Sequence, residues 1–204
     1  MSFLTLAGPH EVEIDKVKRS RFIGLAQPCA SPDEALAFVS QVRARFHDAR
    51  HHCWAWRIGE DARSSDDGEP HHSAGAPILK QLEGHGLTNA VVVVVRYFGG
   101  LKLGVGGLAR AYGAAAASVL DDAQTLRVAV LTPLTITYGY ELAGAVQGSL
   151  HRLGIEPVQA DYGANVTLTL RIAGDRVEST RDQLRDACGG AVEILILPPV
   201  AVPG

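Results

Sequence analysis

The sequence predicts an α+β protein of two domains, the first over residues 1–130 and the second over residues 131–204. Three observations lead to this prediction. The first part surrounds a run of five valines, which does not alternate and is therefore expected to form a strand covered on both faces. The second part reads as strand, helix, strand, strand, helix, strand, the order of a ferredoxin-like βαββαβ domain. The formal charge also changes, from +1 over residues 1–120 to −4 over residues 121–204.

The first domain opens with two short strands, over Glu11–Ile14 and Arg19–Gln27. A helix then begins at Ser31, because serine caps helices, Pro32 suits the first turn and Glu34 completes a capping box. The helix is expected to pack on a sheet, since its apolar residues recur on one side. That apolar side consists of Ala35, Phe38, Val39, Val42 and Phe46.

The middle of the first domain contains the elements that frame its candidate sites. His51–Ile58 alternates, which predicts a strand with His52, Trp54, Trp56 and Ile58 on one face. The elements after it are a polar loop over Gly59–His72, a short helix over Pro77–Leu82, a strand over Asn89–Tyr97, a glycine-rich loop, and a helix marked by Leu108, Tyr112, Ala115 and Val119.

The second domain follows a linker that we place near Asp121–Pro133. A helix over Leu142–Leu153 is expected to end at Gly154, since glycine is the usual residue just past a helix. The other expected elements are strands starting at Leu134, over Val158–Tyr162, over Val166–Ile172 and over Val192–Leu197, with a helix over Asp175–Cys188. The open face of this sheet carries no aromatic residue, so we expect a protein contact or a loose RNA contact there, not base stacking.

The composition favours a cytoplasmic protein. Met1–Glu11 has no basic segment followed by an apolar one, so we expect no secretory signal. The longest apolar run, Ala90–Val95, is far shorter than the roughly 20 residues of a membrane helix, so no membrane association is expected. The three cysteines are scattered, as in a reduced protein. A net charge of −3 argues against a generic nucleic-acid binder and makes DNA an unlikely partner.

The glycine-rich stretch VRYFGGLKLGVGGLARAYG, residues 95–113, is the first candidate site. It lacks the Gly-Lys-Ser/Thr ending of a Walker loop and the G-x-G-x-x-G spacing of a Rossmann loop. Its glycines precede a helix, whose N-terminal N–H groups favour anions, and cations and aromatics accompany them. The candidate phosphate- or nucleic-acid-binding residues are Arg96, Tyr97, Phe98, Gly99, Gly100, Lys102, Gly104, Gly106, Gly107 and Arg110. The alternative is that the glycines serve only tight packing.

The acidic stretch DDGEP, residues 66–70, is the second candidate site. Asp66, Asp67 and Glu69, joined by His51 and His52, could form a pocket for acid–base chemistry in an enzyme. A metal site would use His51, His71 and His72, but the spacing matches no standard metal motif, and we expect no cofactor. The alternative is a solvated acidic turn.

A third candidate is the cluster of cations that precedes the second strand. Lys18, Arg19 and Arg21, with Lys16 before them, could line a nucleic-acid groove. The alternative is that they protect an exposed strand edge, a common role of lysine.

These stretches together resemble the IMPACT/YigZ family over most of the chain. The matching segments are KVKRSRFIG, HHCWAW, DDGEP and VVVVVRYFGGLKLGVGGLARAY, of which the last is the most specific. The resemblance implies a first domain like the second domain of ribosomal protein S5 and domain IV of elongation factor G. It implies a ferredoxin-like second domain similar to elongation factor G domain V. The chain departs from the family at His71 and His72, where small residues are usual, which raises the case for a metal there.

The resemblance also implies a function. Eukaryotic members of the family regulate translational stress signalling through protein contacts, and the related ribosomal folds touch ribosomal RNA. We therefore expect a translation-linked regulatory protein that binds the ribosome, structured RNA or a translation factor and has no catalytic activity. The competing hypothesis is a small-molecule or metal-dependent enzyme with a pocket between the acidic loop and the glycine loop.

Overall fold

The computed structural model describes residues 2–203, which divide into two compact units. Residues 3–127 form the first unit, and residues 128–203, with residue 2, form the second. Each unit contains both helices and strands, so the predicted α+β organisation in two domains is confirmed. The stretch predicted to be a linker is not a loop. Strand β7 (Thr125–Tyr138) runs through it, and the predicted boundary at residues 130 and 131 falls inside that strand.

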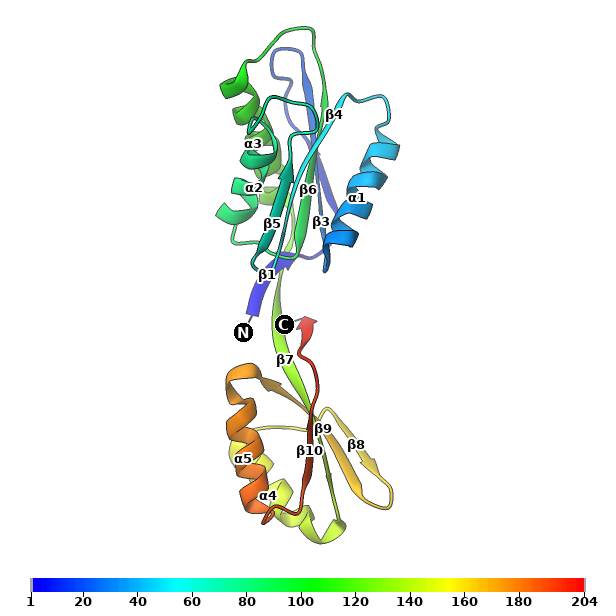
Figure 1. Ribbon diagram of the computed structural model, residues 1–204, viewed down its shortest axis with the longest axis vertical. Helices are drawn as coiled ribbons and strands as arrows, with labels where there is room; N and C mark the ends of the chain where they lie inside the picture. The colour runs from blue at the N-terminus through cyan, green and yellow to red at the C-terminus, as the bar shows by residue number, and fades with distance from the viewer. Residues whose placement is uncertain (1, 204) are drawn as a thin grey trace. The chain divides into compact units, whose positions relative to one another are not determined.

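The first unit is built on a five-stranded antiparallel sheet in the order β2-β3-β6-β4-β5 (Figure 1). Its central strand β6 is buried from Ala90 to Arg96, because helices cover both faces of the sheet as the valine run predicts. The strands are β2 (His10–Glu13), β3 (Arg21–Pro28), β4 (His51–Ile58), β5 (Asp61–Ser65) and β6 (Ala90–Tyr97).

Three helices enclose this sheet, α1 (Pro32–Arg45) on one face and α2 (Gly75–Gly84) with α3 (Val105–Asp122) on the other (Figure 1). The start of α1 is as predicted, since the Ser31 hydroxyl accepts the Glu34 amide N–H at 3.3 Å. Gly24 of β3 lets α3 approach closely, because a Cβ there would lie 2.6 Å from the Ala115 carbonyl oxygen.

Three strands were not predicted: β1 (Ser2–Leu6), β5 and β11 (Val200–Pro203). Strand β5 falls inside the expected polar loop of residues 59–72. Four of its five residues are exposed, so it has no apolar alternation to reveal it in the sequence.

The second unit follows the predicted order of elements. Its strands β10, β7, β9 and β8 form an antiparallel sheet in that order, and both helices pack in the core on the sheet. β11 pairs with the first half of β7, and β1 also pairs with β7. Gly154 ends α4 in the left-handed conformation, with φ of 64°. The elements are α4 (Ala143–Leu153), β8 (Gln159–Tyr162), β9 (Val166–Ala173), α5 (Val177–Ala187) and β10 (Glu193–Ile196).

The helices of residues 2–203 include none with the length and hydropathy needed to cross a membrane.

Candidate functional site

Two loops that are far apart in the sequence meet at one end of the first unit (Figure 1). One is the tight turn at Lys18 and Arg19, which two backbone hydrogen bonds between Val17 and Ser20 close. The φ angles of Lys18 and Arg19, 45° and 68°, lie in the left-handed region. The other is the glycine loop between β6 and α3. Gly99 lies directly on the turn, since a Cβ at Gly99 would come 2.1 Å from the carbonyl carbon of Arg19. The Ser20 hydroxyl accepts the Gly99 N–H at 3.2 Å, so the two loops form one surface.

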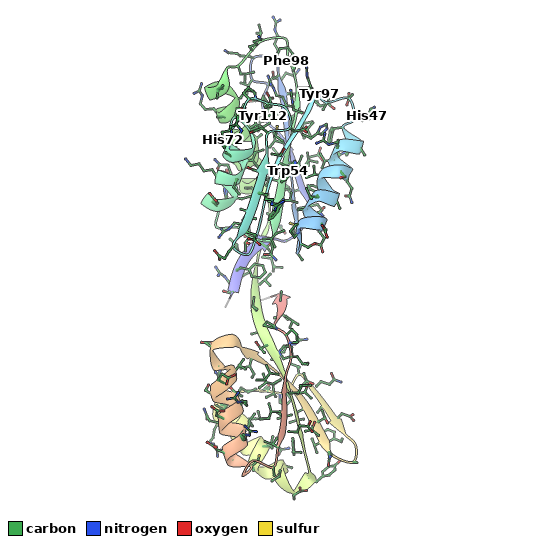
Figure 2. The ribbon with its side chains drawn as sticks, viewed as in Figure 1. His47, Trp54, His72, Tyr97, Phe98 and Tyr112 are labelled. Carbon is green, nitrogen blue, oxygen red and sulfur yellow. The ribbon has the colours of Figure 1, made fainter. Side chains whose placement is uncertain are left out.

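We call this surface the glycine-loop rim and define it by Lys18, Arg19, Phe98, Leu101, Lys102, Val105 and Arg110. Phe98 is 49% exposed, Leu101 46% and Val105 56%, so the rim presents three large apolar side chains to solvent (Figure 2 labels Phe98). The four cations of the rim are exposed, and within residues 2–203 none of them forms an ion pair. The rim thus combines available positive charge with exposed apolar and aromatic surface.

The start of α3 adds N–H groups to the rim. Gly104 caps the helix with φ of 74°, and no side chain accepts a hydrogen bond from this end of it. The first helical bond runs from the Leu108 N–H to the Gly104 oxygen at 2.9 Å, which leaves three earlier amides of the helix before it. A Cβ on Gly106 would meet only the Arg110 guanidinium, at 3.7 Å. The predicted residues Gly100, Gly104, Gly106 and Gly107 all lie in this loop or in the first turn of α3.

Three of the predicted binding residues are instead committed to contacts within the protein. Arg96 is only 4% exposed and donates to Glu69 Oε1 at 2.6 Å, so it does not reach a phosphate on the surface. The Tyr97 hydroxyl donates to Asp48 at 2.7 Å. Arg21 pairs with Glu13 at 2.8 Å. The sequence could not identify these partners, because each lies between 8 and 49 residues away along the chain.

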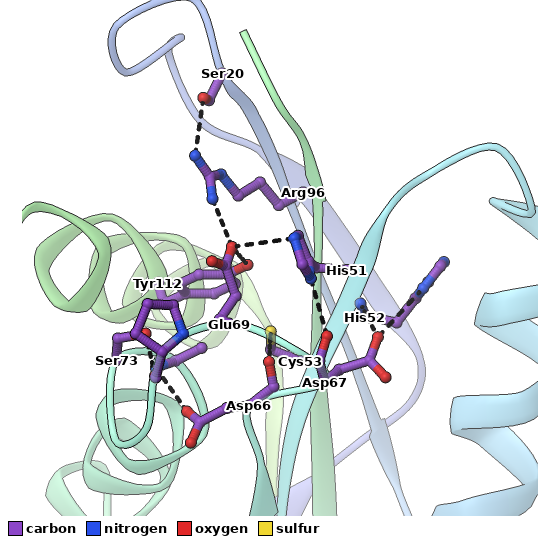
Figure 3. Close-up of polar contacts among 12 residues, drawn as sticks. Ser20, His51, His52, Cys53, Asp66, Asp67, Glu69, Ser73, Arg96 and Tyr112 are labelled. Atoms are coloured by element: carbon purple, nitrogen blue, oxygen red, sulfur yellow. Dashed lines mark hydrogen bonds and ion pairs between the residues drawn. The ribbon is translucent and has the colours of Figure 1, made fainter. Parts of the chain in front are cut away.

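Arg96 belongs to a buried polar network that joins the glycine loop to the acidic loop (Figure 3). Its second nitrogen lies 3.4 Å from the Ser20 hydroxyl, and its guanidinium lies 5.5 Å from the centre of the Phe98 ring. Glu69 also accepts a hydrogen bond from the Tyr112 hydroxyl at 2.8 Å. Burial, with the neighbouring Cys53 and Glu69, raises the pKa of Tyr112, so this hydroxyl stays protonated and donates.

Asp66 of the acidic loop holds the start of α2. Its carboxylate accepts the backbone N–H groups of His72, Ala74 and Gly75, each at 2.9 Å. Burial by itself would raise the pKa of Asp66, but these three hydrogen bonds outweigh burial and lower it.

Asp67 connects the acidic loop to strand β4 and to helix α1. It accepts the His52 N–H at 2.7 Å and pairs with Arg43 of α1 at 2.8 Å. Burial opposes ionisation here too, but the bonds from Arg43 and His52 lower the pKa of Asp67. Both aspartates are therefore ionised, structural groups.

The five residues of the expected acid–base pocket are brought together only in part, since His51 lies near Glu69 and Asp67 while His52 points away from Glu69. His51 and His52 are neighbours on β4, so their side chains point to opposite faces of the sheet. His51 Nε2 lies 3.9 Å from Glu69 on the face of α2 and α3, whereas His52 Nε2 bonds to the Phe46 oxygen at 3.0 Å beside α1. The alternation of side chains along a strand already predicts that the two adjacent histidines point to opposite faces of the sheet. Between the two loops lies the network of contacts that Glu69 makes with Arg96, Tyr112 and His51.

The histidines proposed for a metal make other contacts. The rings of His71 and His72 lie 3.8 Å apart between centroids and are tilted by 37°, and the His71 side chain is 85% exposed. His51 is instead hydrogen-bonded to the Asp67 oxygen at 2.9 Å. Nowhere in residues 2–203 do three or more His, Cys, Asp or Glu side chains form a group that could hold a metal ion.

Three residues of the site were missed in the sequence. Ser20 is fully buried between the two loops, and a serine that follows a run of cations has no apolar pattern around it that would predict burial. Leu101 is an isolated apolar residue among glycines, whose exposure its neighbours do not reveal. Val105 lies three residues before Leu108, in phase with the buried side of α3, so the sequence pattern would place it in the core although it is exposed.

Comparison with known proteins places these features in a family. The family model for the Impact N-terminal domain matches residues 18–120, and a domain of unknown function, DUF1949, matches residues 136–191. The IMPACT family member YigZ of Escherichia coli K12 is 37% identical over 96% of this chain and 98% of its own length. An IMPACT family member of Thermus thermophilus is 42% identical over 76% of this chain and 86% of its own. A crystal structure of a hypothetical protein matches with a TM-score of 0.68 and 36% identity, covering 97% of this chain and 98% of that one.

Proposed function

The chain belongs to the IMPACT family, and from that premise we propose that it is a translation-linked regulatory protein that binds structured RNA of the ribosome through its glycine-loop rim. The observation that supports this most directly is the combination of four exposed cations, unpaired within residues 2–203, with the exposed Phe98 ring. Cations neutralise phosphates, and an aromatic face can stack on an unpaired base. A translation factor in place of RNA is the alternative partner.

The role of the other predicted residues is indirect in this proposal. Arg96, Glu69 and Ser20 hold the rim in shape and do not touch the partner. We assign no catalytic role and no cofactor, because each carboxylate of the acidic loop is already held by donors of the protein. A cytoplasmic location goes with the proposal, and the three cysteines are buried free thiols, as suits a reducing compartment.

The finer fold assignments form part of the same proposal. We propose a ferredoxin-like second unit, since four of its strands have the order β10-β7-β9-β8 and both helices lie in one core. For the first unit we propose the fold of the second domain of ribosomal protein S5, on the family resemblance alone. Fold by itself carries no function, so the rim must be tested directly.

The test is co-sedimentation of the protein with ribosomes and with separated subunits at low and moderate salt. The variant Lys18→Asn/Arg19→Asn/Lys102→Gln removes three rim charges, and asparagine suits the left-handed φ angles of the turn. The control Arg50→Gln/Arg63→Gln/Lys80→Gln removes the same charge from exposed positions outside the rim.

We expect the rim variant to lose salt-sensitive binding and the control to keep it. Equal binding by both variants would contradict the rim as the site. Binding that salt does not weaken would indicate a protein partner, such as a translation factor, and not RNA.

A further inference from the structure

The second unit contains a cavity of about 420 Å³ between the C-terminal end of α4 and strand β8. This volume lies in the range of small-molecule sites. Its apolar walls include Leu150 and Ile155 from the α4 side and Ala160 and Leu168 from the sheet. All residues of β8 are exposed, on both faces of the strand, so the helices leave this part of the sheet uncovered.

A tyrosine whose hydroxyl has no hydrogen-bond partner within the described chain lines this cavity. Tyr138, at the end of β7, is only 3% exposed, and it lines the cavity. Within residues 2–203 its hydroxyl has no hydrogen-bond partner, yet it is not among the polar atoms that are sealed from solvent. A hydroxyl that has no partner among the described residues and keeps contact with solvent is free to form a hydrogen bond with a ligand in the cavity.

The charge of the lining favours a cation. Glu156 is the single acidic residue that lines the cavity, and it forms no ion pair within residues 2–203. No lysine or arginine of the described chain lines the cavity. His151 adds an imidazole, whose nitrogen can accept a hydrogen bond. Two tyrosine rings, Tyr138 and the 67% exposed Tyr162, also line the cavity, and aromatic faces attract cations.

We propose that this cavity binds a small aromatic amine. The ring of the ligand would lie among Leu150, Leu168 and the tyrosines, and its ammonium group would face Glu156, with the Tyr138 hydroxyl as a further polar contact. An anion of the same shape would meet the Glu156 carboxylate without any cation to offset it. The site is distinct from the glycine-loop rim, which lies in the other unit, so neither proposal depends on the other.

The test is a titration of the full-length protein with phenethylamine as the probe, followed by the amide NMR signals of Gly154, Ile155 and Ala160. Phenethyl alcohol and phenylacetate serve as neutral and anionic probes of nearly the same shape. We expect saturable shifts with phenethylamine, at least about fivefold weaker binding of the alcohol, and no binding of phenylacetate.

Three variants locate the binding. Glu156→Gln removes the charge and Tyr138→Phe removes only a hydroxyl, and each is expected to weaken phenethylamine binding about fivefold. Asp161→Asn is the matched control, because Asp161 lies on β8 between two lining residues but does not line the cavity itself.

Several results would overturn the proposal. They are the absence of saturable shifts, equal binding of phenethylamine and the alcohol, stronger binding of phenylacetate, and equal effects of Glu156→Gln and Asp161→Asn.

Discussion

The Arg96 guanidinium and the Glu69 carboxylate form an ion pair at 2.6 Å in which each side chain is only 5% exposed. Arg96 directly follows the five valines of β6, and Glu69 belongs to the acidic loop 27 residues earlier. Two of the stretches that match the family, the acidic loop and the glycine-rich stretch, are therefore joined by a buried ion pair.

Removal of Arg96 should be far more damaging than removal of an exposed arginine. Arg96→Met would leave the Glu69 charge buried with only the Tyr112 hydroxyl as a close donor, at an expected cost of about 3–5 kcal/mol in the free energy of unfolding. Urea unfolding of each variant measures this. Arg21→Met, on the neighbouring strand, breaks a half-exposed pair and should cost at most about 1 kcal/mol. Equal losses in the two variants would show that the buried pair is not structural.

Gly99 should tolerate no side chain, whereas Gly106 should. The Cβ of Gly99→Ala would overlap the backbone of Arg19 and Ser20, at 2.1 and 2.3 Å, so the two loops must separate, at a cost of about 1–3 kcal/mol. In Gly106→Ala the new Cβ meets only the end of Arg110 at 3.7 Å, and alanine favours the helix by up to about 1 kcal/mol. Thermal unfolding of the two variants distinguishes them. A Gly99→Ala protein as stable as Gly106→Ala would contradict the close contact of the loops.

Asp66 should make the stability of the first unit depend on pH in the acid range. The pKa of Asp66 is lower in the folded protein than in the unfolded chain. The contribution of its carboxylate to the free energy of unfolding is therefore complete above the unfolded pKa, about 4, and is lost as the pH falls through the folded pKa. Asp66→Asn lacks this charge, and we expect it to be less stable at pH 7 by about 1–3 kcal/mol. The difference from the unmodified protein should shrink below about pH 4. Urea unfolding at several pH values measures it, and a difference that stayed constant with pH would refute the role of the charged form.

The Tyr112 hydroxyl should contribute modestly to the same network. Tyr112→Phe keeps the ring that packs edge-on against Phe22 but removes the 2.8 Å hydrogen bond to Glu69. The buried carboxylate then loses one donor while keeping Arg96, so we expect a loss of about 1–2 kcal/mol in urea unfolding. Stability unchanged from that of the unmodified protein would mean that Arg96 alone satisfies Glu69.

The sequence predicted the helices and the buried strands well, because their signals are local. Strand β4 begins and ends where its alternation predicts, and Ser31 caps α1 as expected. Strand β5 was missed, since the polar residues of an exposed edge strand have no apolar period. The candidate site was harder to predict. Arg96 is buried and Lys102 is exposed. This difference depends on contacts with distant parts of the chain, and the residues next to Arg96 and Lys102 in the sequence do not reveal it.

The measurement that tests the central claim most directly is the salt dependence of binding to purified ribosomal RNA. The logarithm of the association constant should fall linearly with the logarithm of the salt concentration for the unmodified protein. For Lys18→Asn/Arg19→Asn/Lys102→Gln the slope should be smaller by about two to three, because each lost phosphate contact removes roughly 0.7–0.9. The matched control at Arg50, Arg63 and Lys80 should keep the full slope. A slope identical in the rim variant and the unmodified protein would contradict the rim as the RNA-binding surface.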